Sequence, residues 1–155
     1  MSYTVTLVPG LVYKGYRRGV AFVECPEDKK IDAKVAFDSL KEKKKQDVLN
    51  RFDLWQRGQT CNKYFHGWPN IPQYKECFVF KWAEGRTHHR LYGFLVNPKP
   101  LKDPGYRVCV LVSHARKNEE PTDPSELDGV NELKGKQEIA EAIKKAFPES
   151  GEKKG

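Results

Sequence analysis

The stretch that decides the fold, residues 74–117, reads YKECFVFKWAEGRTHHRLYGFLVNPKPLKDPGYRVCVLVSHARK. Three apolar or alternating segments within it predict three consecutive β-strands. Glu84-Gly85 supplies a tight turn, so the first two strands should be antiparallel neighbours. A longer connection containing three prolines, residues 97–105, leads to the third strand. The stretch therefore predicts a β-meander.

Side chains alternate between the two faces of a strand, so the sequence also predicts which residues share a face. In the first strand Phe78, Phe80 and Trp82 should oppose Lys75, Cys77, Val79 and Lys81. The third strand, with valines at 108, 110 and 112, is the most apolar and should be central. In the second strand the alternation separates His88, Arg90, Tyr92 and Phe94 from His89, Leu91 and Leu95.

Positive charge is concentrated on the same region. Residues 61–117 carry ten Lys or Arg against three Asp or Glu, a net charge of +7, together with all four histidines of the chain. Residues 118–155 carry six basic and ten acidic side chains, a net charge of −4. A field this asymmetric raises the local concentration of polyanions around the meander. The alternative is a basic surface that serves only solubility.

The length and composition limit the class of protein. We expect one domain over residues 1–148, large enough to bury a core, followed by a disordered polar tail at 149–155. No segment approaches the roughly 20 apolar residues that a membrane helix needs. The first residues, MSYTVTLVPG, lack the layout of a secretion signal. These features predict a cytoplasmic protein with no membrane partner.

The four cysteines predict neither a zinc site nor a disulfide framework. Zinc ligands usually come in short-spaced pairs, and the chain has no C-x-x-C pair. Two of the cysteines fall inside predicted strands, where a thiol behaves as a small apolar side chain. We expect reduced, structural cysteines, no metal and no cofactor; the positions are Cys25, Cys61, Cys77 and Cys109.

The segments before the meander predict a strand and helices. Residues 3–8 alternate like a half-buried strand, and residues 11–16 and 20–25 allow a hairpin around 17–19. Asp32 is an expected N-cap, with apolar residues at helical spacing as far as Trp55 and a stop at Gly58. The lysine-rich run 41–45 interrupts that spacing. One long helix and a helical hairpin that turns at this run both fit the pattern.

The segments after the meander predict further helices. Asp123-Pro124-Ser125-Glu126 opens a short helix or turn, and Ile139, Ile143 and Phe147 repeat at helical spacing before Pro148. Together the elements predict an α+β fold. Its small antiparallel sheet should consist of the three-strand meander plus an N-terminal strand or hairpin, packed by helices.

This order of elements resembles the RelE/HigB superfamily of toxin ribonucleases. The matching segments are NKYFHGWPNIPQYKECFVFKW, HHRLYGF and VLVSHARKNEEPTDPSEL. The family has a similar progression: a loop ending in Tyr-Lys, an arginine opening the next strand, and a strand leading into basic turn residues. The resemblance covers residues 32–130. It implies a RelE-like fold whose sheet binds messenger RNA on the ribosome and cuts it, and an antitoxin protein that masks this surface.

Metal-independent cleavage of RNA needs three chemical roles. One group takes the proton from a 2′-hydroxyl and another protonates the departing 5′-oxygen, ideally with a pKa near the working pH. A third stabilises the crowded phosphorane, which suits the planar, always charged guanidinium of arginine. Histidine titrates in the right range, and a lysine among other cations can act as a base because its pKa is lowered.

The resemblance places these roles on particular positions. Lys75 corresponds to the family's catalytic lysine, Arg90 to the arginine of the second strand, and Arg116 and Lys117 to the basic pair after the third. His114, two residues before Arg116, is added as an acid or base from its own chemistry. We predict that these five residues are catalytic. The RNA contacts are expected from Lys63, Lys81, His88, Tyr92 and Arg107.

The chain departs from the family pattern at two points. Cys77 stands where a second lysine is common, and no tyrosine follows the basic pair in residues 118–123. The proton donor for the leaving group therefore stays open between His114, His88 and Tyr92. Arg90 has a structural alternative, pairing with a glutamate across the sheet.

Two other functions compete with cleavage. One is a non-catalytic RNA- or ribosome-binding protein of the same fold, which the departures favour. The other is a ParE-like inhibitor that contacts a protein target through its terminal helices.

Overall fold

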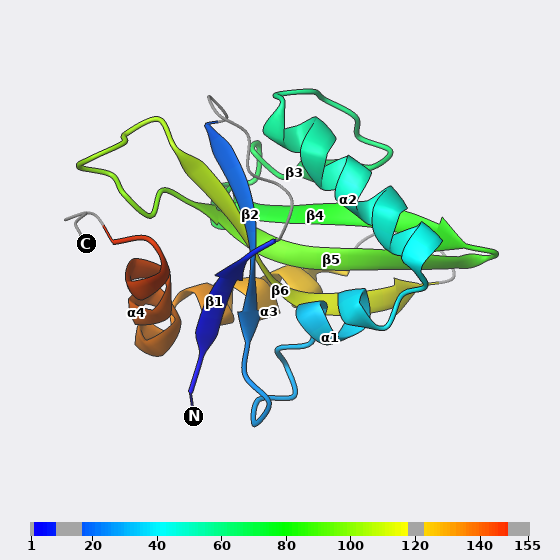
Figure 1. Ribbon diagram of the computed structural model, residues 1–155, viewed down its shortest axis with the longest axis horizontal. Helices are drawn as coiled ribbons and strands as arrows, with labels where there is room; N and C mark the ends of the chain where they lie inside the picture. The colour runs from blue at the N-terminus through cyan, green and yellow to red at the C-terminus, as the bar shows by residue number, and fades with distance from the viewer. Residues whose placement is uncertain (1, 9–16, 118–122, 149–155) are drawn as a thin grey trace.

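A six-stranded mixed sheet runs through the computed structural model, which describes residues 2–8, 17–117 and 123–148. Figure 1 shows the strands in the order β1-β2-β6-β5-β4-β3. Their bounds are β1 Thr4–Leu7, β2 Arg18–Glu24, β3 Phe65–Gly67, β4 Cys77–Glu84, β5 Thr87–Val96 and β6 Arg107–Lys117. The α+β class is thus confirmed, and β6 lies inside the sheet as its apolar sequence predicted.

The sheet is mixed because β2 pairs with β6 in parallel, whereas all other neighbours are antiparallel. The prediction of a purely antiparallel sheet with a three-strand meander was wrong on two counts. Two helices and the whole meander separate β2 from β6, which gives the chain the long crossover that a parallel pair requires. The meander also has a fourth, short strand, β3, inside what was expected to be a loop at 61–73.

Two local features fix the register of the meander. Gly85 adopts φ of +62° between β4 and β5, in the left-handed region that glycine enters at little cost. The pairing of β5 with β6 shifts by one residue between Tyr92 and Gly93. A Cβ at Gly93 would collide with the backbone of Val110, so only glycine lets the two strands approach at this bulge.

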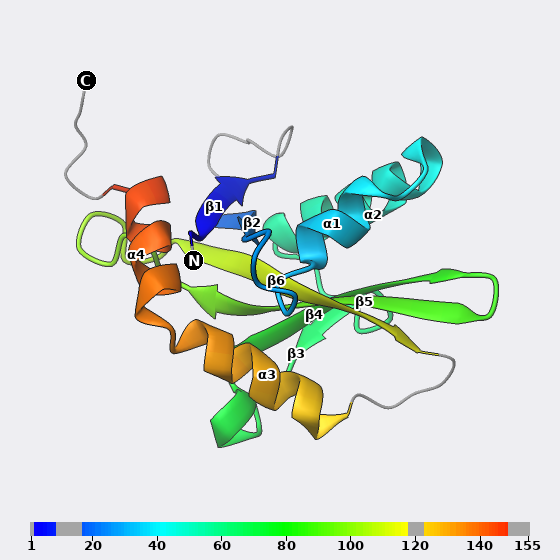
Figure 2. The same cartoon turned by 90° about the horizontal axis from the view of Figure 1, so that it is seen from below.

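Helices cover both faces of the sheet, as Figure 2 shows. The helices α1 (Ala33–Asp38) and α2 (Glu42–Gln56) lie on one face, and α3 (Pro124–Lys134) and α4 (Gln137–Ala146) on the other. A single 3₁₀ turn, Pro72–Tyr74, precedes β4.

The chain between β2 and β3 forms two helices rather than one long helix. The break falls at residues 39–41, so the lysine-rich run begins α2 instead of forming the turn itself. Asp32 is the N-cap of α1, but its side chain makes no capping hydrogen bond. It accepts a hydrogen bond from the backbone N–H of His114 instead, at 2.8 Å. Gly58, with φ of +84°, follows the end of α2 as predicted.

The predicted helix start at Asp123 is confirmed. The Asp123 carboxylate accepts from the backbone of Ser125, and the Glu126 side chain accepts from the backbone N–H of Asp123, so the two form a capping box. The terminal amphipathic helix is α4, which buries Ile139 and Ile143.

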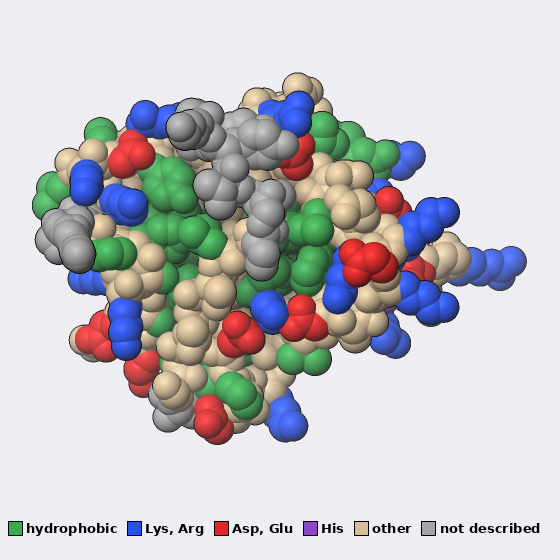
Figure 3. All heavy atoms as spheres, viewed as in Figure 1, with side chains coloured by type: hydrophobic (Ala, Val, Ile, Leu, Met, Phe, Trp, Pro, Cys, Tyr) green, Lys and Arg blue, Asp and Glu red, His purple; other side chains and the backbone are tan. Residues whose placement is uncertain are grey.

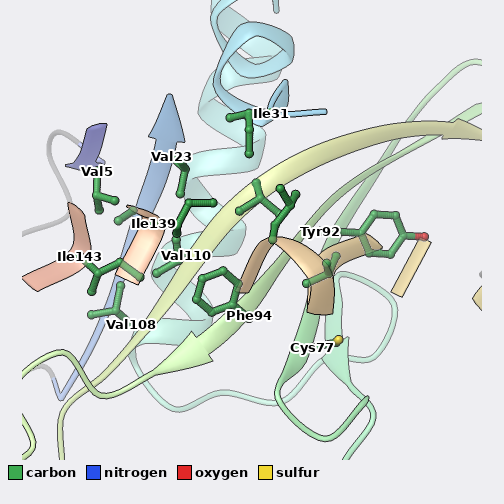
Figure 4. Close-up of a cluster of buried hydrophobic side chains, with 14 of the residues drawn as sticks. Val5, Val23, Ile31, Cys77, Tyr92, Phe94, Val108, Val110, Ile139 and Ile143 are labelled. Atoms are coloured by element: carbon green, nitrogen blue, oxygen red, sulfur yellow. The ribbon is translucent and has the colours of Figure 1, made fainter. Parts of the chain in front are cut away.

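Each face of the sheet has its own apolar core. Valines of β2 and β6 pack with Phe94 against α3 and α4, and Figure 4 shows Val108 and Val110 close to Ile139 and Ile143. On the α1 and α2 face, Phe52 packs edge-on against Phe80 at a centroid distance of 4.7 Å. The predicted alternation of Phe78, Phe80 and Trp82 against Cys77 and Val79 is therefore confirmed.

Several other expectations concern particular segments. The four cysteines are free thiols, and three of them are buried. Residues 11–16, the first half of the proposed hairpin, and the tail at 149–155 lie outside the described residues. Across the described ranges, no helix has the length and apolar character needed to cross a bilayer.

Candidate nucleic-acid interface

The end of the sheet at the β4–β5 turn is where basic side chains and histidines meet. Figure 3 shows Lys and Arg gathered around this end of the molecule, where the hairpin projects. Neither flanking strand reaches it: β3 pairs with β4 only as far as Phe80, and β2 pairs with β6 only as far as Leu111. The last residues of β4 and β6 are therefore left with open edges, and a pocket lies beside each edge.

The pocket on the β6 side, which we name the histidine pocket, has a volume of about 390 Å³. It lies between α1 and the sheet. Two cations and two carboxylates line it, with two imidazoles. The full lining is Asp32, Val35, Ala36, Ser39, Leu40, Lys41, Trp82, Glu84, His89, His114 and Arg116.

Three rings stack along the inner wall of the histidine pocket. Trp82 and His89 are cross-strand partners, and their rings lie 5.0 Å apart and nearly parallel, at 8°. The His114 ring follows at 5.2 Å from that of His89. The shift in register between Tyr92 and Gly93 makes this stacking possible. Because β6 has one extra residue there, His114 lies on the same face of the sheet as His89.

The stacked rings also form a chain of hydrogen bonds. Nε2 of His89 lies 3.2 Å from Oε1 of Glu84, and Nδ1 of His89 lies 2.9 Å from Nε2 of His114. An ionised carboxylate only accepts, so neutral His89 donates from Nε2 and accepts at Nδ1. His114 must then donate from Nε2. This assignment leaves Nδ1 of His114 as the ring nitrogen able to accept a proton.

Burial keeps both imidazoles neutral. Burial, together with the neighbouring His89 and Arg116, lowers the pKa of His114 to about 4. Burial also lowers the pKa of His89, partly opposed by the Glu84 carboxylate. At neutral pH, His114 is therefore an unprotonated base beside the Arg116 guanidinium.

Asp32 holds His114 in place from outside the sheet. Its backbone N–H donates to the carbonyl of Val112 at 3.1 Å, and its carboxylate accepts from the N–H of His114 at 2.8 Å. Asp32 thus continues the hydrogen bonding of β6 beyond the point where β2 ends. Burial raises the pKa of this carboxyl group.

The second pocket, on the β4 side, has a volume of about 290 Å³, and we name it the basic pocket. Trp82 and His89 line both pockets, so the two adjoin at this pair of rings. No carboxylate is among its lining residues, whereas two lysines and two arginines are. The full lining is Arg51, Lys63, Tyr64, Lys81, Trp82, Ala83, His88, His89 and Arg90.

The basic pocket contains four of the predicted site residues: Lys63, Lys81, His88 and Arg90. Lys63 is exposed and His88 half-buried. The Arg51 guanidinium, which comes from α2, lies 4.3 Å from the centre of the Tyr64 ring. Three of its cations, Arg51, Lys63 and Lys81, are at least partly exposed and form an electrostatic site for a polyanion.

Arg90 lies at the floor of this region and is only 1% exposed. Its Nη1 donates to the Tyr92 hydroxyl at 3.3 Å, and that hydroxyl donates to Glu126 at 3.0 Å. The proposed structural partners of Arg90 interact elsewhere: Glu84 accepts a hydrogen bond from His89, and Glu76 forms an ion pair with Arg107. Tyr92 is also buried, so both residues connect the sheet to α3.

The structure does not bring all the predicted catalytic residues together. His114 and Arg116 share the histidine pocket, whereas Arg90 lies on the opposite face of the sheet, in line with Lys81. Lys75 is exposed and precedes β4 at the far end from the turn, roughly 20 Å along the strand from Lys81.

Two further predicted residues stand apart from both pockets. Arg107 begins β6, at the opposite end of that strand from Arg116. Lys117 ends β6 paired with His88, and its side chain lies outside the described part.

Sequence reasoning missed Glu84, Asp32 and Arg51 as members of the site and gave no role to His89. Glu84 and His89 could have been found from their positions on either side of a two-residue turn, because side chains on the two strands lie close together there. Asp32 and Arg51 come from helices distant in sequence, and no local pattern marks them.

Comparison with known proteins adds no relative. No family model, no curated protein and no solved structure matches the chain. Within the described residues, no group of three or more His, Cys, Asp or Glu side chains is arranged to hold a metal ion.

Proposed function

We propose that this protein binds single-stranded RNA at the end of its sheet and cleaves it by attack of a 2′-hydroxyl on the adjacent phosphate. One observation carries the proposal. An unprotonated imidazole, His114, is oriented by a hydrogen-bonded His89 and Glu84 and lies in one pocket with the exposed Arg116. A neutral imidazole held by a second group beside a cation can accept a proton from a hydroxyl while the cation stabilises the phosphate; the lowered pKa of His114 makes it a weak base at neutral pH.

The chemical step uses these groups as follows. Nδ1 of His114 takes the proton of the 2′-hydroxyl while O2′ forms a bond to phosphorus. The bond from phosphorus to O5′ breaks, O5′ takes up a proton, and the products carry a 2′,3′-cyclic phosphate and a 5′-hydroxyl. Arg116 stabilises the added negative charge on the phosphate oxygens. Of the other candidate donors, Tyr92 is bonded to Glu126 and His88 lies on the opposite face of the sheet from His114, so on this proposal water supplies the proton that O5′ takes up.

The adjoining basic pocket supplies the binding energy for the backbone. Phosphate contacts position a nucleic acid and account for much of its affinity. The cations of the basic pocket lie beside Trp82 and His89, the two residues that line both pockets. Consecutive phosphates of one RNA strand can therefore occupy the two pockets.

The order of elements supports a RelE/HigB-like toxin as the class. The helix pair α1 and α2 and the meander β4–β6 follow one another as in the resemblance. On this proposal the substrate is messenger RNA, ribosome-bound or free, and an antitoxin covers the basic end.

The test compares two variants with a matched control. His114→Gln and Arg116→Ala should each slow cleavage about 100-fold or more, the usual size of a lost acid–base or electrostatic contribution. Arg57→Ala removes an exposed arginine that lies in neither pocket and should cleave as the wild type does. Free RNA and messenger RNA on ribosomes should both be offered as substrates. Wild-type rates in both site variants would reject the proposal.

A second candidate function is RNA binding without cleavage. Its support is the wide separation of Lys75 from His114 and the burial of Arg90, which deprive the site of two groups that the resemblance implied. Salt-sensitive RNA binding with no product from the wild-type protein would favour this candidate and reject cleavage.

A further inference from the structure

A third pocket lies on the other side of Lys81, between the end of α2 and the edge strand β3. Its volume is about 630 Å³. Lys81 lines both this pocket and the basic pocket, so the two adjoin at that residue. Of the residues that line this pocket, only Lys81 was predicted from the sequence to contact RNA.

Uncharged amide side chains provide much of the polar lining of this pocket. Three side-chain amides, Gln59, Asn62 and Asn70, belong to it, and we name it the amide pocket. Each amide has both a donor and an acceptor end, and none is bonded to another group within the described residues. No carboxylate lines the pocket, so an anionic strand meets no repulsion there.

The floor and one end of the amide pocket are defined by aromatic side chains and a cation. Trp55, Phe65 and Phe78 form a closely packed apolar floor. The Arg18 guanidinium lies 4.9 Å from the Trp55 ring centre and donates to the Trp55 carbonyl at 2.8 Å. The lining of the pocket therefore combines two cations, Arg18 and Lys81, with the neutral amides.

The loop that carries two of the amides is held by backbone hydrogen bonds. The N–H of Gly58 donates to the carbonyl of Trp55 at 2.9 Å, and the N–H of Gln59 donates to that of Leu54 at 3.1 Å. Phe65 donates to the carbonyl of Cys61 at 2.9 Å, which closes the loop around Asn62. A loop ordered in this way loses little entropy on binding.

We propose that the amide pocket binds a base of the same RNA strand whose phosphates occupy the basic pocket. Amide side chains complement the hydrogen-bonding edges of bases, and RNA is read mainly through unpaired bases of single strands. The pocket is thus a specificity site, placed next to the backbone-binding site. The inference rests on the proposed function, because it requires RNA at the basic pocket.

The experiment measures binding of four 2′-O-methyl oligonucleotides of about eight nucleotides, a common site size for single-strand binders, which differ at one base. These probes carry no free 2′-hydroxyl and are not cleaved. Wild-type protein should bind one base about tenfold tighter than the weakest, the size expected for a paired amide contact. Asn62→Ala or Asn70→Ala should abolish this preference, and the matched control Asn50→Ala, an exposed amide on α2 that lines no pocket, should keep it.

The outcomes separate this inference from the proposed function. Equal affinity for all four probes, or a preference that survives in both amide variants, would overturn the inference and leave RNA binding intact. Failure of the wild-type protein to bind any probe, or single-stranded RNA itself, would overturn both. Unchanged affinity for the least favoured probe in the variants would show that they are folded and still hold the backbone.

Discussion

Replacing His114 should make the stability of the protein less dependent on pH. The pKa of His114 is lowered from the ordinary 6.5 to about 4 in the folded protein, because burial, His89 and Arg116 disfavour its charged form. The unfolded chain therefore binds a proton that the folded chain does not, and stability falls as pH decreases from about 6.5 to about 4. Above pH 6.5 the contribution is constant.

The size of the effect follows from the shift. A difference of about 2.5 pH units corresponds to about 3 kcal/mol at 1.4 kcal/mol per unit. The ring is only partly shielded from solvent, so screening reduces the expected loss to about 1–2 kcal/mol. For a chain of this length that loss lowers Tm by about 3–6 °C between pH 7 and pH 4.5.

The assay is denaturant unfolding of the wild type and His114→Gln at pH values between 4.5 and 7.5. The variant should be less stable at neutral pH, since it loses the stacking and the hydrogen bond to His89, but it should lose about 1–2 kcal/mol less on acidification. The NMR signal of the His114 ring should titrate near pH 4. Parallel pH profiles for the two proteins, or a titration near pH 6.5, would refute the reasoning.

The remaining predictions concern RNA binding and the two cores. The logarithm of RNA affinity should fall linearly with the logarithm of salt concentration. Lys63→Ala and Lys81→Ala should each reduce the slope by about 0.7, while the control Lys145→Ala on α4 should not. Equal slopes for all these proteins in binding titrations would contradict RNA binding at the basic pocket. Gly93→Ala should lower the free energy of unfolding by about 1–3 kcal/mol, because the added Cβ would collide with the Val110 backbone at the bulge. An unchanged free energy in urea unfolding would show that the two strands can move apart there. Phe52→Ala should cost about 3–5 kcal/mol, since the ring is fully buried among three aromatic neighbours. A loss below 1 kcal/mol would mean that the core around α2 refills the space.

The meander was predictable because its signals are local. Alternating side chains and a turn at Gly85 predicted β4 and β5 as antiparallel neighbours, and the structure confirms the pairing, with Gly85 and Arg86 between the paired Glu84 and Thr87. The parallel pairing of β2 with β6 was not predictable in the same way, since more than 80 residues separate the two strands. A short apolar strand has the same sequence pattern whether a hairpin or a crossover connects it to its neighbour in the sheet.

The candidate site was predictable only in part, and the reason is geometric. His114 and Arg116 were recognised from residue type and position, but their partners depend on the bulge at Gly93 and on the contact of Asp32 with β6. The resemblance placed Lys75 with them, whereas Lys75 follows a 3₁₀ turn, precedes β4 and lies six positions before Lys81 in the chain. Alternation also sends Arg90 to the opposite face from His89, which residue type alone does not reveal.

The most direct measurement of the account is the end chemistry of a defined RNA after incubation with the wild-type protein in the presence of a chelator. The account predicts fragments with a 2′,3′-cyclic phosphate and a 5′-hydroxyl, and no cut where a single 2′-deoxy nucleotide replaces the attacking residue. Fragments with a 5′-phosphate, cleavage of the deoxy-substituted site, or no fragments from free or ribosome-bound RNA would contradict it.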